Sequence, residues 1–115
     1  HITLHICGDT TTMQDLIPGT GADLFSFDQA PVALTAEKMQ GLVRLVGNFP
    51  PHGLLKSSKL PVEEMTGQII REGIDYHKGL VISTGCEVPI MCDSGRLENL
   101  IRIGKTAEYE DVWSR

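Results

Sequence analysis

The sequence predicts an α/β fold whose core is a parallel sheet, and three observations support this prediction. Four short apolar runs, each bounded by Gly, Asp or Pro, are typical of buried strands: residues 2–7, 22–27, 43–48 and 79–84. Each run is followed by a stretch with helix-like spacing of apolar residues: 11–16, 31–40, 61–73 and 96–107. Strict β-α alternation implies parallel strands joined by right-handed crossovers.

The predicted helices differ in the strength of their end signals. Residues 11–16 stop before Gly19, and residues 31–40 interleave aliphatic with charged side chains. The clearest helix is 61–73, because Pro61 begins it, acids fill its first turn and Gly73 is read as following its end. Two stretches complete the chain: 96–107 carries an apolar stripe, and the polar stretch 108–115 is expected to be a loose tail.

The spacing of the strands suits units of a (β/α)8 barrel. They begin at residues 2, 22, 43 and 79, so two repeats are near twenty residues and the third contains a longer loop. Units of a complete barrel average roughly 30 residues. Four βα units are therefore half of a TIM (β/α)8 barrel, and a small open four-stranded sheet is the alternative.

Bulk properties limit the class of protein. The chain has 115 residues, enough for one domain spanning 1–115, and begins with His1 directly before an apolar run, so we expect a piece of a longer protein, with a trimmed initiator Met as the alternative. A formal charge of −5 argues against a nucleic-acid partner. We also expect no membrane partner, because no apolar run approaches the roughly 18 residues of a membrane span and no signal peptide is visible.

Three cysteines make a poor disulfide framework, so we expect a reducing, cytoplasmic setting with free thiols.

A candidate metal site lies at the carboxyl ends of the strands. His5 and Cys7 are two residues apart in a strand, so their side chains share one face. Cys86 directly follows the fourth strand, and parallel strands gather their carboxyl ends at one edge. One imidazole and two thiolates are three of the four ligands of tetrahedral zinc, leaving an open, catalytic position. The alternative is a core histidine with two inert buried cysteines.

Five stretches occurring in order resemble a known family. They are LHICGDT (4–10), GADLFSFDQ (21–29), VGNFPP (46–51), STGCEVP (83–89) and LENL (97–100). Together they resemble the uroporphyrinogen decarboxylase superfamily and, more closely, its corrinoid-dependent methyltransferase branch. The resemblance extends to about residue 107 and corresponds to the C-terminal part of a family member.

The resemblance implies the C-terminal half of a TIM-barrel methyltransferase. It implies Zn²⁺ held by His5, Cys7 and Cys86, which keeps an acceptor thiol as a thiolate. It also implies a methyl group carried as methylcobalamin on a partner corrinoid protein, and a small-molecule methyl acceptor. The N-terminal half of the barrel lies outside the sequence, so we expect methyl transfer only from a complete barrel, and either self-association or pairing with a complementary N-terminal half.

Asp28 and Asp9 are the candidate catalytic residues. Asp28 ends the second strand and either faces the substrate or forms an Asx turn. Asp9 either hydrogen-bonds His5 or caps a turn. The same ambiguity applies to Asn48, at the end of the third strand.

The remaining polar candidates are weaker. Glu87 is read as having no role in the site, although it adjoins Cys86 and could be a transient ligand. Cys92 stands where the family usually has a proline-rich turn, and is read as a loop cysteine rather than a spare thiol of the site. His52 and His77 fall in connectors and are read as solvated.

Two other functions remain open at this point. One is a uroporphyrinogen decarboxylase-like enzyme that acts on a tetrapyrrole without metal. The other is a non-catalytic half-barrel that needs a complementary chain, because half a barrel exposes two sheet edges and much apolar surface.

Overall fold

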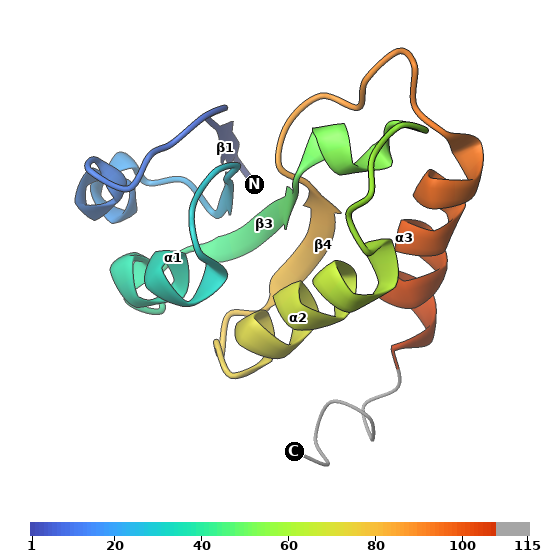
Figure 1. Ribbon diagram of the computed structural model, residues 1–115. Helices are drawn as coiled ribbons and strands as arrows, with labels where there is room; N and C mark the ends of the chain where they lie inside the picture. Colours follow the sequence, from blue (N-terminus) through green and yellow to red (C-terminus); the bar gives the residue numbers. More distant parts are fainter. Residues whose placement is uncertain (108–115) are drawn as a thin grey trace.

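The computed structural model describes residues 1–107, and its core is a four-stranded parallel sheet (Figure 1). The predicted tail, 108–115, lies outside the described residues. The strands pair in the order β1-β2-β3-β4 and are β1 (Thr3–His5), β2 (Leu24–Ser26), β3 (Arg44–Phe49) and β4 (Leu80–Thr84). The predicted α/β class and all four strands are confirmed.

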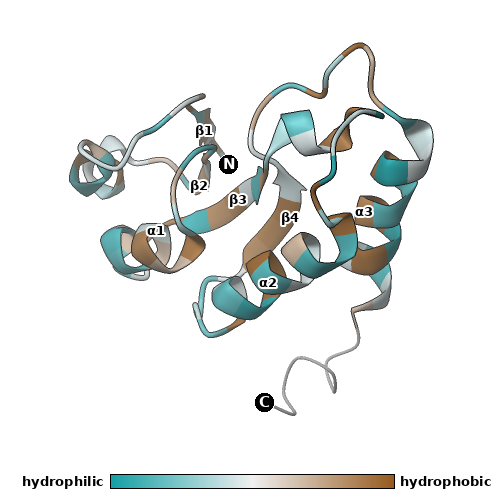
Figure 2. Ribbon diagram, viewed as in Figure 1, coloured by the Kyte–Doolittle hydropathy of each residue, from teal (hydrophilic) through white to brown (hydrophobic). Residues whose placement is uncertain are grey.

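Three α-helices follow the second, third and fourth strands, as predicted. They are α1 (Val32–Met39), α2 (Val62–Ile74) and α3 (Ser94–Thr106). Because the strand order advances in one direction and crossovers are right-handed, all three helices lie on the same side of the sheet. The hydrophobic colouring of β4 in Figure 2 marks part of the sheet that α2 covers.

The predicted first helix, 11–16, is wrong. In its place the chain forms two short 3-10 helices, η1 (Gln14–Leu16) and η2 (Pro18–Thr20). The segment is too short to offset the cost of nucleating an α-helix, and Pro18 cannot donate the backbone hydrogen bond that would continue one. Gln14 is fully buried here, and its Nε2 donates to the hydroxyls of Thr10 and Thr35.

The predicted end of α2 is also misplaced, since Gly73 lies inside the helix. A Cβ on Gly73 would lie 2.6 Å from Cδ2 of Leu80, so this glycine lets α2 pack closely on β4. Close packing, rather than a helix end, is the reason for glycine here. A third short 3-10 helix, η3 (Pro51–Leu54), was not predicted.

The hydrophobic core lies between the sheet and the helices. In one register row, Phe25 and Leu45 are fully buried and Leu80 is partly buried against them. In the next row His5, Ser26, Val46 and Val81 lie side by side on the other face, where Val81 is 48% exposed. Neighbours in register share a face, so the helices cover one face and no described element covers the other.

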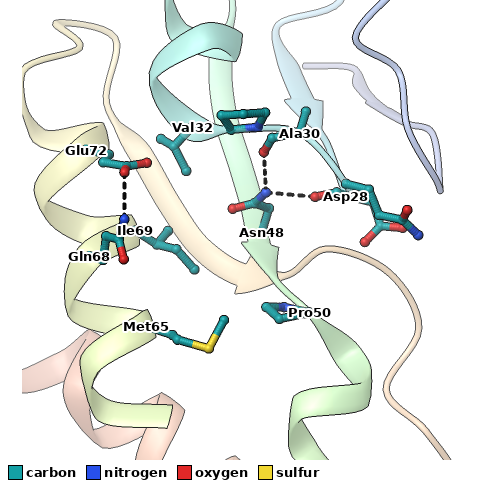
Figure 3. A pocket seen from close by; sticks show the side chains of 11 residues that line it. Asp28, Ala30, Val32, Asn48, Pro50, Met65, Gln68, Ile69 and Glu72 are labelled. Carbon is teal, nitrogen blue, oxygen red and sulfur yellow. Dashed lines mark hydrogen bonds between the residues drawn. The ribbon is translucent and has the colours of Figure 1, made fainter. Parts of the chain in front are cut away.

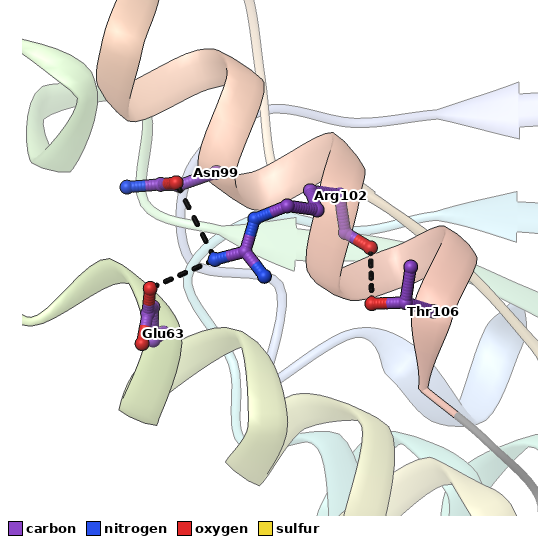
Figure 4. A network of polar contacts seen from close by, with 4 residues as sticks. All are labelled: Glu63, Asn99, Arg102 and Thr106. Atoms are coloured by element: carbon purple, nitrogen blue, oxygen red, sulfur yellow. Dashed lines mark hydrogen bonds and ion pairs between the residues drawn. The ribbon is translucent and has the colours of Figure 1, made fainter.

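Two polar contacts lie along the C-terminal helix. Asp93 caps α3 by accepting a 3.0 Å hydrogen bond from the backbone amide of Arg96. Arg102 Nη2 pairs with Glu63 Oε1 of α2 at 2.9 Å (Figure 4). Both of these side chains are exposed, so the ion pair contributes at most about 1 kcal/mol. The packing of α2 and α3 therefore depends mainly on their apolar sides.

Candidate metal centre

His5, Cys7 and Cys86 meet at the carboxyl edge of the sheet. His5 is the last residue of β1, and Cys7 and Cys86 each lie two residues beyond the end of a strand. One potential ligand atom from each lies within 4.8 Å of the other two. His5 Nε2 is 3.1 Å from Cys7 Sγ. The structure thus brings together the three residues that the sequence analysis selected.

The meeting of Cys7 and Cys86 requires the sheet to curl. Their strands are the first and fourth in the sheet, and three strand spacings of about 4.8 Å would separate them by about 14 Å if the sheet were flat. Their Cα atoms are 5.7 Å apart. Curvature of the sheet and the short extensions beyond each strand together close this distance.

In the structure the sulfur atoms of Cys7 and Cys86 are joined as a disulfide. This differs from our expectation of free thiols, which rested on the odd cysteine count. The odd count did not exclude a disulfide, because the fold brings the Cα atoms of Cys7 and Cys86 into the range that a disulfide bond requires. Cys92 is the free cysteine. Reduction of the disulfide would leave two thiols beside the His5 ring.

The reduced donor set fits a zinc ion. Zinc with bonds of about 2.0–2.3 Å to nitrogen and sulfur has its tetrahedral ligand atoms about 3.5–3.8 Å apart. The ligand atoms of His5, Cys7 and Cys86 already lie within 4.8 Å of one another. Small rotations of the side chains would bring them to that spacing. Imidazole and thiolate are also the ligand types that zinc prefers.

Ser26 of β2 contacts the other side of the His5 ring. The register of the two strands pairs His5 with Ser26, and His5 Nδ1 lies 2.8 Å from Ser26 Oγ. The two ring nitrogens therefore face different groups, a hydroxyl on one side and the sulfur of Cys7 on the other.

Asp28 lies buried between the two loops that carry the cysteines. Its Oδ2 accepts a 2.8 Å hydrogen bond from the backbone amide of Gly8, the residue after Cys7. A Cβ on Gly85, the residue before Cys86, would lie 2.4 Å from Asp28 Oδ1. These contacts suit Asp28 to position both loops, and its part in catalysis stays a prediction.

Asp9 and Glu87 stand apart from this cluster. Asp9 Oδ1 accepts a hydrogen bond from the backbone amide of Thr11, which lowers the pKa of the carboxyl from its usual range. This contact is the turn that the sequence analysis gave as one of two alternatives for Asp9. The other was a hydrogen bond to His5, but the ring nitrogens of His5 pair with Ser26 and Cys7. Glu87 is exposed on the loop after Cys86.

The connector candidates lie elsewhere. Cys92 is a half-buried loop cysteine whose backbone bridges to Leu55, as the sequence reading expected. His52 and His77 are exposed, and the ring of His77 lies over Gly41 and beside Tyr76.

A family model identifies the chain's relatives. The model for uroporphyrinogen decarboxylase matches residues 1–106, nearly all of the described chain. The chain belongs to the uroporphyrinogen decarboxylase family. Within that superfamily it falls in the corrinoid methyltransferase branch, of which it represents a partial region.

Three similar proteins come from Methanosarcina species. The chain is 28% identical to the methylcobamide:CoM methyltransferase MtbA of Methanosarcina acetivorans over 106 residues, which is 92% of this chain and 30% of that protein. It is 27% identical to MtbA of Methanosarcina mazei over 107 residues, 92% of this chain and 30% of that protein. It is also 27% identical to the methylated-thiol–coenzyme M methyltransferase of Methanosarcina mazei over 113 residues, 95% of this chain and 29% of that protein. The chain thus spans less than a third of these relatives.

Ser26 contacts His5 in the candidate site, and the sequence analysis did not select it. It is the single hydroxyl in the apolar run ADLFSF, which is a weak signal for a polar contact. Its partner depends on the strand register, which pairs it with His5 across 21 residues. The register is set by the fold, and the sequence alone does not provide it.

A hollow of about 300 Å³, which Asp28 also lines, lies between α2, the end of β3 and the turn that joins β2 to α1 (Figure 3). Asn48 borders it and donates to the backbone oxygens of Asp28 and Ala30, each at 2.7 Å. These bonds secure the turn between β2 and α1, so Asn48 acts here on the backbone. The lining does not include His5, Cys7 or Cys86.

Of the described helices, none is both long and apolar enough to cross a bilayer.

Proposed function

We propose that this chain carries the metal centre of a zinc-dependent methyltransferase that moves a methyl group between a corrinoid protein and a thiol or similar small acceptor. The observation that carries the proposal is the convergence of His5, Cys7 and Cys86 within 4.8 Å at the carboxyl edge of a parallel sheet. The names of the relatives, which are methyltransferases acting with methylcobamide or a methylated thiol and coenzyme M, support the substrate class.

In this proposal, the reduced Cys7 and Cys86 and the imidazole of His5 are three ligands of the metal. Zinc bound there would supply Lewis acidity that keeps an acceptor thiol ionised near neutral pH. Methyl transfer forms a sulfur–carbon bond and breaks the cobalt–carbon bond, whose electron pair stays on cobalt, while the thiol proton goes to solvent. Asp28, bonded to the Gly8 amide, holds the first cysteine loop in place during this exchange.

We further propose that the four βα units are the C-terminal half of a barrel. The sequential strand order and the curl that joins the ends of β1 and β4 support this architecture. So does the uncovered face carrying Val46 and Val81, because parallel sheets in proteins are normally covered on both faces. A complementary N-terminal half would cover that face and complete the pocket.

Metal analysis of the reduced chain tests the proposed centre. After reduction and loading with zinc, about one equivalent per chain should remain bound through gel filtration. Cys7→Ser and Cys86→Ser should each abolish retention, because removing one of three protein ligands greatly weakens the site. Cys92→Ser is the matched control and should retain zinc. A reduced chain with intact thiols that retains no zinc contradicts the proposal.

A methyl-transfer assay tests the reaction and separates it from the rival function. The zinc-loaded chain, assembled with four complementary βα units, should demethylate methylcobalamin when coenzyme M is supplied, followed by the absorbance change of the corrin. The Cys7→Ser variant should be inactive. Decarboxylation of uroporphyrinogen that survives replacement of both thiols would instead favour the metal-free tetrapyrrole enzyme.

A further inference from the structure

We propose that Ser26 is a positioning residue that holds the His5 ring at Nδ1 and so directs His5 Nε2 toward the metal. This inference rests on the proposed function, because it assigns a role relative to the same centre. The contact that carries it is the 2.8 Å approach of His5 Nδ1 to Ser26 Oγ.

A neutral imidazole has one N–H donor and one lone pair, and only the nitrogen with the lone pair can bind a metal. His5 Nε2 is the nitrogen that faces the sulfur cluster, at 3.1 Å from Cys7 Sγ. Metal binding through Nε2 therefore requires the proton to be on Nδ1. The hydroxyl of Ser26 can bond Nδ1 of either tautomer, and once a metal occupies Nε2 it accepts the hydrogen bond from Nδ1–H.

The strand register places the side chains of His5 and Ser26 next to each other. His5 and Ser26 are register partners in the parallel pair β1 and β2, so their side chains leave the same face next to each other. The backbone supports the same alignment, because the amide of Ile6 donates to the carbonyl of Ser26 at 3.2 Å. Ser26 is half-buried and His5 is exposed, so the contact depends on the strand register rather than on exclusion of water.

Metal-bound histidines usually donate their second ring nitrogen to such a partner, and loss of the partner typically weakens metal affinity 10- to 100-fold. Ser26 provides this contact with a neutral hydroxyl. Its removal should leave the ring free to rotate.

The first experiment reads the orientation of the His5 ring without metal. In spectra of the reduced chain, nuclear Overhauser contacts should link the ring proton on His5 Cε1, next to Nδ1, to the side chain of Ser26. In Ser26→Ala these contacts should weaken because the ring rotates, whereas Ser26→Thr, which keeps the hydroxyl, should restore them. A wild-type ring without these contacts, or contacts unchanged in Ser26→Ala, overturns the assignment.

The second experiment measures metal affinity by competition with a chelator, using Zn²⁺ and then Co²⁺, whose visible absorption reports the ligand set. Ser26→Ala should bind Zn²⁺ about 10- to 100-fold more weakly, and Ser26→Thr should recover most of the affinity. Thr3→Val is the matched control, because it removes a hydroxyl from the same strand as His5, two residues away, and should bind normally.

The outcomes separate the two proposals. If the wild-type chain binds neither metal after reduction, the proposed function fails, and the ring-orientation spectra still decide the role of Ser26. If the wild-type chain binds and Ser26→Ala binds equally well with an unchanged Co²⁺ spectrum, the role of Ser26 is refuted and the metal centre stands. Thermal unfolding of each variant confirms that weaker binding does not arise from loss of the fold.

Discussion

The backbone of Gly85 packs directly against the carboxylate of Asp28. A Cβ at position 85 would lie 2.4 Å from Asp28 Oδ1 and 2.8 Å from its Cα, closer than any Cβ contact that packing tolerates. Since Asp28 also accepts a hydrogen bond from Gly8, one buried side chain supports the loops of both candidate cysteine ligands.

This contact predicts that Gly85→Ala damages both stability and the metal centre. Overpacking at a buried position should lower the free energy of unfolding by about 1–3 kcal/mol. Displacement of the loop should also weaken zinc binding by moving Cys86. Urea denaturation and zinc competition would measure the two effects. Gly19→Ala is the control, because a Cβ there meets no atom within 4 Å; equal behaviour of the two variants would show that the contact is unimportant.

The disulfide predicts that zinc uptake depends on the redox state of the chain. Cys7 and Cys86 cannot act as thiolate ligands while their sulfurs are bonded to each other. The oxidised chain should therefore retain almost no zinc, and treatment with a thiol reductant should restore about one equivalent. Peroxide added to the zinc-loaded chain should release the metal, which a colorimetric zinc indicator would detect. Full zinc retention by a chain shown by mass spectrometry to carry the disulfide would be inconsistent with the site.

Burial raises the pKa of Tyr76, whose hydroxyl donates to the backbone oxygen of Val43. A pKa that is higher in the folded than in the unfolded chain means that the folded chain binds more protons near and above pH 10, so stability falls as pH rises there. Urea denaturation between pH 8 and pH 11 should show this loss. Tyr76→Phe should be less stable by about 1 kcal/mol at pH 8 and should show a shallower decline above pH 10. Parallel declines in the two proteins would exclude Tyr76 as the source.

The uncovered face of the sheet predicts self-association of the isolated chain. Val46 and Val81 lie on it beside each other, and an exposed apolar sheet face of this kind favours contact with another copy. Size-exclusion chromatography with light scattering should find species larger than the monomer of 12.6 kDa. Val81→Thr should shift them toward the monomer, whereas Ile101→Thr, on the helical side, should not. A wild-type chain that stays monomeric at high concentration would argue against this face as an interface.

Much of the fold follows from local sequence signals. Apolar runs of strand length, helix-like spacing of apolar residues and the end signals of 61–73 were sufficient to predict four strands and three α-helices. The first helix failed because Pro18 and the shortness of its segment favour 3-10 turns over an α-helix. Gly73 was misread because close packing against Leu80 and a helix end both call for glycine, and only the neighbouring strand distinguishes them.

For the candidate site, the sequence by itself determined the ligand types and their positions at strand ends. His5 and Cys7 share a face through the period of a strand, and Cys86 follows the fourth strand, so parallel topology makes their meeting feasible. Only the tertiary structure decided the rest: the curl that joins the first and fourth strands, the pairing of Ser26 with His5, and the placement of Asp28 between the cysteine loops. These contacts join residues some twenty to eighty positions apart, and their geometry depends on sheet register and curvature, which no local pattern encodes.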